Sequence, residues 1–355
     1  MRVLAIGVYE TIYSQAALFH LERSWIYWLL LFLLVDLAYY WGHRMSHEIN
    51  LFWGGHVVHH QSEDYNLSVA LRQSSFQVVW TFAFSLPLAV MGFDTLDFAL
   101  VSAFNTLYQF WIHTEAINKM GWFETLFNTP SHHRVHHGRN PKYIDKNHAG
   151  TLIIWDKLFG TFRQEEERPT YGITKPIQSW NPVWANISHY VSMAEDLKRI
   201  LTWRDKIKYL FKKPGWLPEY LGGYGAAPVV EKSTYQKYET PAPVQLNYYV
   251  LFQYIICLVT TSLFLFKQSQ FSMMEKGVGA VLLSLWVVNS GVLFEKRKWV
   301  WYAEWARILA YPMMLALATY FFKLTPAFYG TALVYFSLSS IWFYRLTTHA
   351  PLQTT

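Results

Sequence analysis

The chain has 355 residues, of which 52% are hydrophobic, 19% aromatic and only 15% charged. Soluble domains average about 25% charged residues, so this composition argues against an ordinary water-soluble protein. One cysteine excludes a disulfide framework. The net charge of +6 is typical of a membrane protein with basic loops, and no basic stripe indicates nucleic-acid binding.

Long apolar segments dominate the chain. The first 20 residues are only moderately apolar and predict a surface or re-entrant helix. Because a membrane span needs about 20 mostly apolar residues, we expect spans at 25–41, 76–92, 96–112, 246–266, 277–294, 305–322 and 327–344. The intervening stretch 176–245 contains Pro and Gly turn signals, and we expect a cytosolic linker with short helices there.

The distribution of Lys and Arg predicts the orientation of these spans. Basic residues gather in the polar stretch 114–245 and around residues 295–298, whereas the turns on the other side are poorer in them. Cytosolic loops are enriched in Lys and Arg, so the histidine motifs described next are expected to face the cytosol. The predicted fold is an all-α, polytopic membrane bundle. It is divided into an N-terminal segment (1–24), a three-span catalytic core (25–175), the linker (176–245) and a four-span region (246–355).

Three histidine motifs lie at the ends of these apolar segments. They are His43-x-x-x-His47, His56-x-x-His59-His60 and His133-x-x-His136-His137. On a helix, residues three and four apart share a face, so each motif directs several imidazoles to one place. Histidine next to a membrane span usually has a functional reason. We therefore expect the motifs to form a metal centre.

The number of imidazoles favours two metal ions over one. A single zinc site closes with four ligands, and the H-E-x-x-H motif of zinc peptidases is absent. Ligand type alone does not separate iron from zinc. His113, at the end of the third expected span, is a further candidate ligand, and His132 a candidate partner of the ligands. His20, His148, His189 and His349 are isolated, and we expect them to lie outside the site.

Carboxylates near the motifs are candidates to orient the imidazoles, because ligating histidines often donate their second N–H to a carboxylate. These candidates are Asp36, Glu48, Glu63, Asp64 and Asp145. For Glu48, Glu63 and Asp64, an ordinary place in a solvated loop or helix end is an equal alternative.

The motif set H-x-x-x-H, H-x-x-H-H and H-x-x-H-H in a membrane chain resembles the fatty acid hydroxylase and sterol desaturase superfamily. Residues 39–74 and 107–162 resemble the alkylglycerol monooxygenase family within it, and the similarity continues more weakly through the C-terminal spans. That family usually has more hydrophobic sequence before the first histidine-bearing span, and only 24 residues precede it here. The chain is therefore expected to be naturally short, a truncated gene model or an isoform.

The resemblance implies a di-iron, tetrahydrobiopterin-dependent oxygenase of the endoplasmic reticulum membrane. It would use O2 to hydroxylate the carbon beside the ether oxygen of an alkylglycerol, giving a fatty aldehyde and glycerol. Glu48 would be a catalytic or pterin-side carboxylate. The implied metal ligands are His43, His47, His56, His59, His60, His113, His133, His136 and His137.

Two other functions remain open from the sequence. One is a sterol or fatty-acyl hydroxylase that receives electrons from cytochrome b5. The other is a membrane metal transporter, although transporters usually place their ligands at the bilayer midplane within repeated halves. No repeat is visible here.

Overall fold

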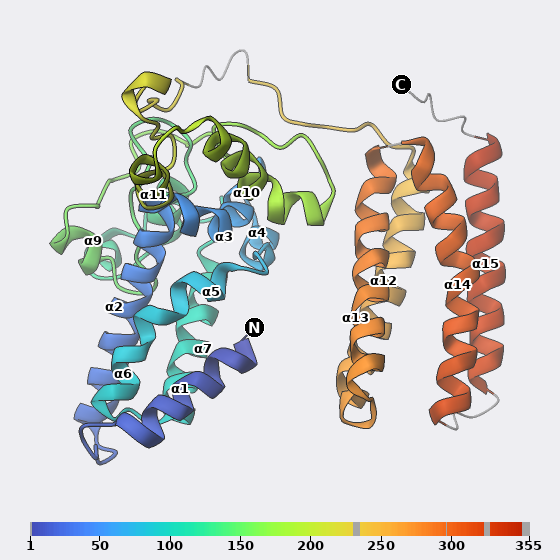
Figure 1. Ribbon diagram of the computed structural model, residues 1–355, viewed down its shortest axis with the longest axis horizontal. Coiled ribbons are helices and arrows are strands. Elements are labelled where there is room, and N and C mark those ends of the chain that lie inside the picture. The colour runs from blue at the N-terminus through green and yellow to red at the C-terminus, as the bar shows by residue number, and fades with distance from the viewer. Residues whose placement is uncertain (1, 230–234, 296, 323–326, 350–355) are drawn as a thin grey trace. The chain divides into compact units, whose positions relative to one another are not determined.

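The computed structural model describes residues 2–229, 235–295, 297–322 and 327–349 (Figure 1). Within these ranges the regular elements are helices, and strand pairing is limited to isolated bridges such as Phe127 with Leu152. The chain forms two compact units. The first contains Met1–Ile177 and Asn186–Lys237, and the second Gln178–Ala185 and Tyr238–Thr355.

The first unit contains the histidine motifs. Its helices are α1 (Arg2–Ala16), α2 (Trp25–Glu48), α3 (Asn50–His60), α4 (Leu67–Leu71), α5 (Gln77–Thr81), α6 (Leu86–Met91), α7 (Thr95–Trp111), α8 (Pro130–His136), α9 (Ile154–Leu158) and α11 (Trp203–Phe211). Helix α10 (Pro182–Arg199) begins in the second unit and continues into the first. The segment expected to be a linker thus contains an 18-residue helix as well as short ones.

Helix α2 is the longest helix of the first unit (Figure 1). The Ser24 side chain caps its first turn by accepting from the Tyr27 backbone N–H at 3.2 Å. A mostly apolar run, interrupted by Asp36, then leads to the polar end of the helix, and its 24 residues are long enough to cross a bilayer. Ile49 is extended and ends the helix, so the chain turns directly into α3. This arrangement brings the first two histidine motifs together.

The expected span at 76–92 is a broken apolar helix. Helix α5, a short 3-10 turn over Phe82–Ser85 and α6 follow one another, with Pro87 in the first turn of α6. Proline lacks the N–H that a continuous helix would need. Gly92 ends α6 with φ of +94°, and a Cβ there would lie 2.0 Å from the Phe19 carbonyl oxygen. This segment and the 17-residue α7 are shorter than a full span.

The second unit contains α12 (Val244–Lys267), α13 (Met273–Val292), α14 (Lys298–Phe322) and α15 (Ala327–His349). Among the described residues, three helical segments are long and apolar enough to cross a membrane: Trp25–Glu48, Val244–Gln270 and Met273–Glu295. The last two coincide with the spans expected at 246–266 and 277–294. The spans expected at 305–322 and 327–344 fall on α14 and α15, where the side chains of 312–329 lie outside the described part.

Polar side chains join the helices of the second unit internally. Glu304 is buried and paired with Arg307, and it also accepts hydrogen bonds from Tyr249 of α12 and Asn289 of α13. Arg307 donates to the Tyr335 hydroxyl of α15 at 2.6 Å. The buried charge is therefore paired and hydrogen-bonded, as a low-dielectric interior requires.

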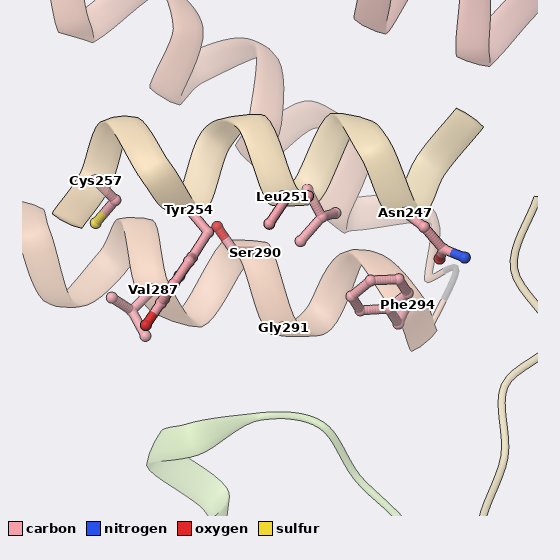
Figure 2. A pocket seen from close by; sticks show the side chains of 9 residues that line it. Asn247, Leu251, Tyr254, Cys257, Val287, Ser290, Gly291 and Phe294 are labelled. Atoms are coloured by element: carbon pink, nitrogen blue, oxygen red, sulfur yellow. The ribbon is translucent and has the colours of Figure 1, made fainter. Parts of the chain in front are cut away.

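A cavity of about 360 Å³ lies between α12 and α13 (Figure 2). Its walls are mostly apolar, with Leu251 and Val287 on opposite helices and Asn247 and Cys257 towards its two ends. The cysteine is buried and free.

Candidate metal centre

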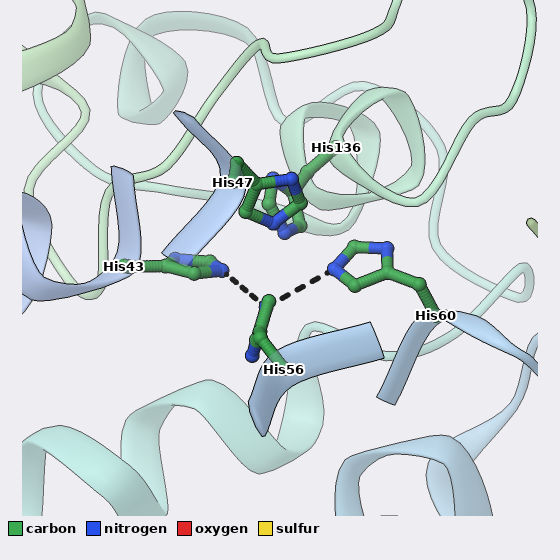
Figure 3. Close-up of side chains that lie close together, drawn as sticks. All are labelled: His43, His47, His56, His60 and His136. Atoms are coloured by element: carbon green, nitrogen blue, oxygen red, sulfur yellow. Dashed lines mark hydrogen bonds between the residues drawn. The ribbon is translucent and has the colours of Figure 1, made fainter. Parts of the chain in front are cut away.

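Five imidazoles from three helices meet at one point (Figure 3). The group, here called site A, consists of His43 and His47 of α2, His56 and His60 of α3, and His136 of α8. Each residue offers a ring nitrogen within 4.8 Å of those of the others, and all five are buried. The i, i+4 spacing within α2 and within α3 puts each pair on a common helix face.

A second group of four imidazoles, site B, lies next to site A. It consists of His59, His113, His133 and His137, again with ring nitrogens within 4.8 Å of one another. Helices α3 and α8 contribute to both sites. The rings of His60 in site A and His137 in site B stack with their centroids 4.4 Å apart. The two sites therefore adjoin within one buried cluster.

Backbone carbonyls fix which nitrogen of several rings carries the proton. The Nδ1 atoms of His43, His59 and His113 lie 2.7, 3.2 and 2.7 Å from the carbonyl oxygens of His148, Arg72 and Gln109, respectively. His136 Nδ1 lies 3.0 Å from the Lys146 carbonyl oxygen. A carbonyl cannot donate, so each Nδ1 donates and each Nε2 keeps its lone pair.

The Nε2 atoms of neighbouring rings lie close together in both sites. In site B, Nε2 of His59 lies 3.2 Å from Nε2 of His113. In site A, Nε2 of His56 lies 2.9 Å from that of His43 and 3.1 Å from that of His60. Imidazole–metal bonds of about 2.1 Å at right angles would put neighbouring nitrogens about 3.0 Å apart. The spacing fits imidazoles arranged around an ion.

Within the described ranges, further ring nitrogens of the cluster are buried without a hydrogen-bond partner. They are Nε2 of His47, His136 and His137 and Nδ1 of His56 and His133. Buried polar atoms in folded proteins are normally hydrogen-bonded, so a set of unpartnered nitrogens in one cluster indicates another bonding partner. The donor set contains no sulfur and suits a transition metal that accepts imidazole.

Burial keeps these imidazoles neutral, which is the form that binds a metal. It lowers the pKa of His59 to about 4. Burial is also the largest cause that lowers the pKa of His56, His60, His133 and His136 well below the ordinary value, with neighbouring imidazoles adding to the effect.

Among the described residues, Asp36, Glu48, Asp64 and Asp145 form no hydrogen bond to a ring nitrogen of sites A and B. The nearest, Asp145 Oδ1, is 3.9 Å from His47 Nδ1. Asp36 is fully buried and accepts from the backbone N–H groups of Thr151 and Leu152 at 2.7 and 2.9 Å. It thus holds the loop that follows the third motif against α2.

Arg134, buried on α8, links the segments that carry the site B histidines His113 and His133. Its guanidinium forms a bidentate pair with Glu165 at 2.9 and 2.6 Å. A third nitrogen donates to the carbonyl oxygens of Thr114 and Ile117 at 3.1 and 2.7 Å. These contacts fix the turn after His113 against the helix that carries His133.

Of the remaining histidines, His132 lies outside both sites, with its ring against Phe162. His189 bonds to Asn50, and the side chain of His349 lies outside the described residues. His148 differs from our expectation of an isolated residue. It is completely buried, its ring centroid is 5.0 Å from that of His47, and neither ring nitrogen has a hydrogen-bond partner in the described part of the chain. It lies in a loop without motif spacing, so no sequence signal identified it.

A polar cavity of about 480 Å³ lies beside site A. Its walls include Arg44, Glu48, Asp145 and Lys213. Glu48 is paired with Arg44 at 3.2 Å and with Lys213 at 3.6 Å. Opposite charges therefore line a space large enough for a small polar molecule.

The fold and the site define a multi-pass helical membrane protein with buried histidine clusters that could hold metal ions. Residues 28–161 match the family model described as fatty acid hydroxylase. No solved structure matches the chain.

Comparison with curated relatives assigns the chain to a more specific family within this class of membrane protein. The chain is 38% identical to alkylglycerol monooxygenase of Danio rerio over 359 residues, which cover 96% of this chain and 78% of the relative. It is 48% identical to the enzymes of that name from Xenopus tropicalis and Homo sapiens, over 61% of this chain. In those two comparisons it spans 49% of the relative's length, about half. The chain belongs to the alkylglycerol monooxygenase family.

Proposed function

We propose that this protein is an ether-lipid monooxygenase. It would hydroxylate the carbon beside the ether oxygen of an alkylglycerol with O2 and tetrahydrobiopterin, and the product would give a fatty aldehyde and glycerol. The observation that supports this proposal most strongly is the pair of adjoining all-histidine sites in a chain that belongs to this family.

Hydroxylation solves the chemical difficulty of an ether. Its carbon is only weakly polarised and alkoxide is a poor leaving group, so direct hydrolysis is slow. Inserting one oxygen atom into the C–H bond gives a hemiacetal, which separates into aldehyde and alcohol when its hydroxyl proton moves to the departing oxygen. The second oxygen atom leaves as water, with two electrons and two protons from the reduced pterin.

The chain's own residues would hold and orient the reactants. Site A and site B would each hold one iron ion, and the irons and the pterin would supply oxygen activation and reducing electrons. The nine imidazoles are buried and offer their ring nitrogens as metal donors. The carbonyl bonds to Nδ1 of His43, His59, His113 and His136 keep their Nε2 lone pairs directed inward.

We assign Glu48 to the cofactor side of the centre. It lines the polar cavity beside site A, and a carboxylate there matches the adjacent N–H donors on the pyrimidine ring of a pterin. We further propose that the enzyme resides in the endoplasmic reticulum membrane with both sites facing the cytosol, in agreement with the Lys and Arg distribution.

The test is aldehyde release from an alkylglycerol by the purified protein, with reduced pterin as the only electron donor. Turnover that requires tetrahydrobiopterin supports the proposal. The fatty acid hydroxylase match favours one alternative, a sterol or fatty-acyl hydroxylase. Turnover with NADH and cytochrome b5 but not with pterin would establish that alternative instead. Metal flux into vesicles without oxygen consumption would indicate a transporter.

A further inference from the structure

Helix α11 presents an apolar row to its surroundings. Trp203, Ile207 and Phe211 are spaced by four residues and are 79%, 57% and 55% exposed. Leu201, just before the helix, is 80% exposed. Residues four apart lie on one helix face, so these side chains form a continuous strip, here called the α11 strip. A continuous exposed apolar strip usually marks an interaction surface.

The other face of α11 is fixed to the protein, so the strip cannot turn inward. Tyr209 is buried in a cluster with residues of α3 and α10. The backbone N–H of Asn50 donates to the carbonyl oxygen of Lys212 at 2.9 Å, and the Asn50 amide donates to that of Tyr209 at 3.3 Å. Helix α11 is thus held at the start of α3, two residues beyond the end of α2.

This anchor places α11 at the depth of a membrane surface. Helix α2 has 24 residues, which make about 36 Å at 1.5 Å per residue. The hydrocarbon core of a bilayer is about 30 Å thick. With the exposed Trp25 at one interface, Glu48 lies about 6 Å beyond the hydrocarbon at the other. Helix α11, which lies beside that end in Figure 1 and is hydrogen-bonded to Asn50, is then level with the lipid head groups.

The charge around the strip selects the kind of lipid. Residues 201–213 contain five basic residues and one acidic residue. The acidic one, Asp205, lies in the first turn of α11, where its backbone N–H donates to the hydroxyl of the capping Thr202, and it is 3.7 Å from Lys208. The excess of positive charge complements anionic head groups. An apolar strip flanked by Lys and Arg is the pattern of a helix that lies in the membrane surface.

We propose that α11 lies in the head-group layer of an anionic leaflet, with Trp203, Ile207 and Phe211 inserted towards the acyl chains. Arg204, Lys206 and Lys212 would contact lipid phosphates, whereas Lys213 is paired with Glu48 and Asp145. This contact would fix the end of α2 that carries the site A histidines at the membrane surface. The inference rests on α11 and α2 alone and does not depend on the proposed reaction.

The single cysteine allows a direct test. In a Cys257→Ser background, Ile207→Cys and Lys208→Cys are spin-labelled in separate full-length proteins and placed in nanodiscs of phosphatidylcholine with or without phosphatidylserine. Lys208 is the matched control, since it is the next residue on α11 and its side chain is 42% exposed. Collision of each label with O2, which enters lipid, and with a water-soluble nickel chelate then gives its depth.

We expect the Ile207 label to collide more with O2 and the Lys208 label more with the chelate. Phosphatidylserine should deepen the Ile207 label, and a variant with Arg204, Lys206 and Lys212 changed to Gln should lose that effect. An Ile207 label that collides mainly with the chelate would overturn the proposal. So would one shielded from both reagents, which would show a protein partner or a second copy on the strip. Equal depth in the two kinds of nanodisc would overturn the selection of anionic lipid.

Discussion

The Nε2 atoms of His59 and His113 face each other at 3.2 Å, and both carry lone pairs because each Nδ1 donates to a backbone carbonyl. Two neutral imidazoles repel in this arrangement unless a cation lies between them. In site A, Nε2 of His43 likewise keeps its lone pair and lies 2.9 Å from Nε2 of His56. These distances between ring nitrogens indicate metal binding independently of any comparison with related proteins.

The two sites should lose their ions separately. His59→Ala removes a donor from site B and His56→Ala removes one from site A, so each variant should retain about one of the two metal ions of the parent. Elemental analysis of purified protein measures the ratio. His20→Ala, at an exposed position outside both sites, is the control and should keep two. Loss of both ions in each single variant would show one shared site.

Asp36 should be important for stability although it binds no histidine ring. Asp36→Ala would leave the buried N–H groups of Thr151 and Leu152 and the Trp155 indole N–H without their acceptor. An unsatisfied buried donor costs about 1–3 kcal/mol, so the variant should be destabilised by several kcal/mol. Thermal unfolding in detergent should show a clearly lower Tm than for Glu22→Ala, an exposed acidic control. Equal Tm values would contradict this role.

Arg134 should support site B more than site A. Arg134→Met leaves Glu165 buried without its bidentate partner and frees the Thr114 and Ile117 carbonyls. Removing one partner of a buried ion pair costs about 3–5 kcal/mol. The site B ion should therefore dissociate faster than the site A ion when a chelator is added. Arg163→Met, which breaks a more exposed pair, should leave both rates unchanged. Equal acceleration at both sites in Arg134→Met would contradict the assignment.

The metal-free protein should be sensitive to acid. Burial lowers the pKa of His59 and of His132 to about 4, while the unfolded values are near 6.5. Between pH 6.5 and 4 the unfolded chain binds protons that the folded chain excludes, so stability should fall as pH falls. Each such histidine contributes a slope of up to about 1.4 kcal/mol per pH unit. The Tm of metal-stripped protein from pH 8 to 4 measures this, and His132→Asn should reduce the slope. A Tm that rises on acidification would exclude the mechanism.

Residue spacing was sufficient to predict the convergence of the histidine motifs. The i, i+4 pairs His43/His47 and His56/His60 share helix faces, and the end of α7 brings His113 to the same cluster. Spacing could not predict how the nine imidazoles divide into two groups, because His133 and His136 share a helix but belong to different sites. That division depends on the rotation of α8 against α3.

Other features depend on long-range contacts that a local pattern does not contain. Carbonyl groups, rather than the neighbouring carboxylates, orient several rings, since the loop that contains Lys146 and His148 folds back over α2. The buried position of His148 follows from the same loop. Apolar composition predicted a full span at 76–92, but Pro87 and the 3-10 turn before it interrupt the helix there.

Anomalous diffraction at the iron edge, from crystals of the purified protein, tests the central claim most directly. We predict two separate iron peaks, one among the ring nitrogens of His43, His47, His56, His60 and His136 and one among those of His59, His113, His133 and His137. A single peak, or iron outside these two groups, would contradict the account.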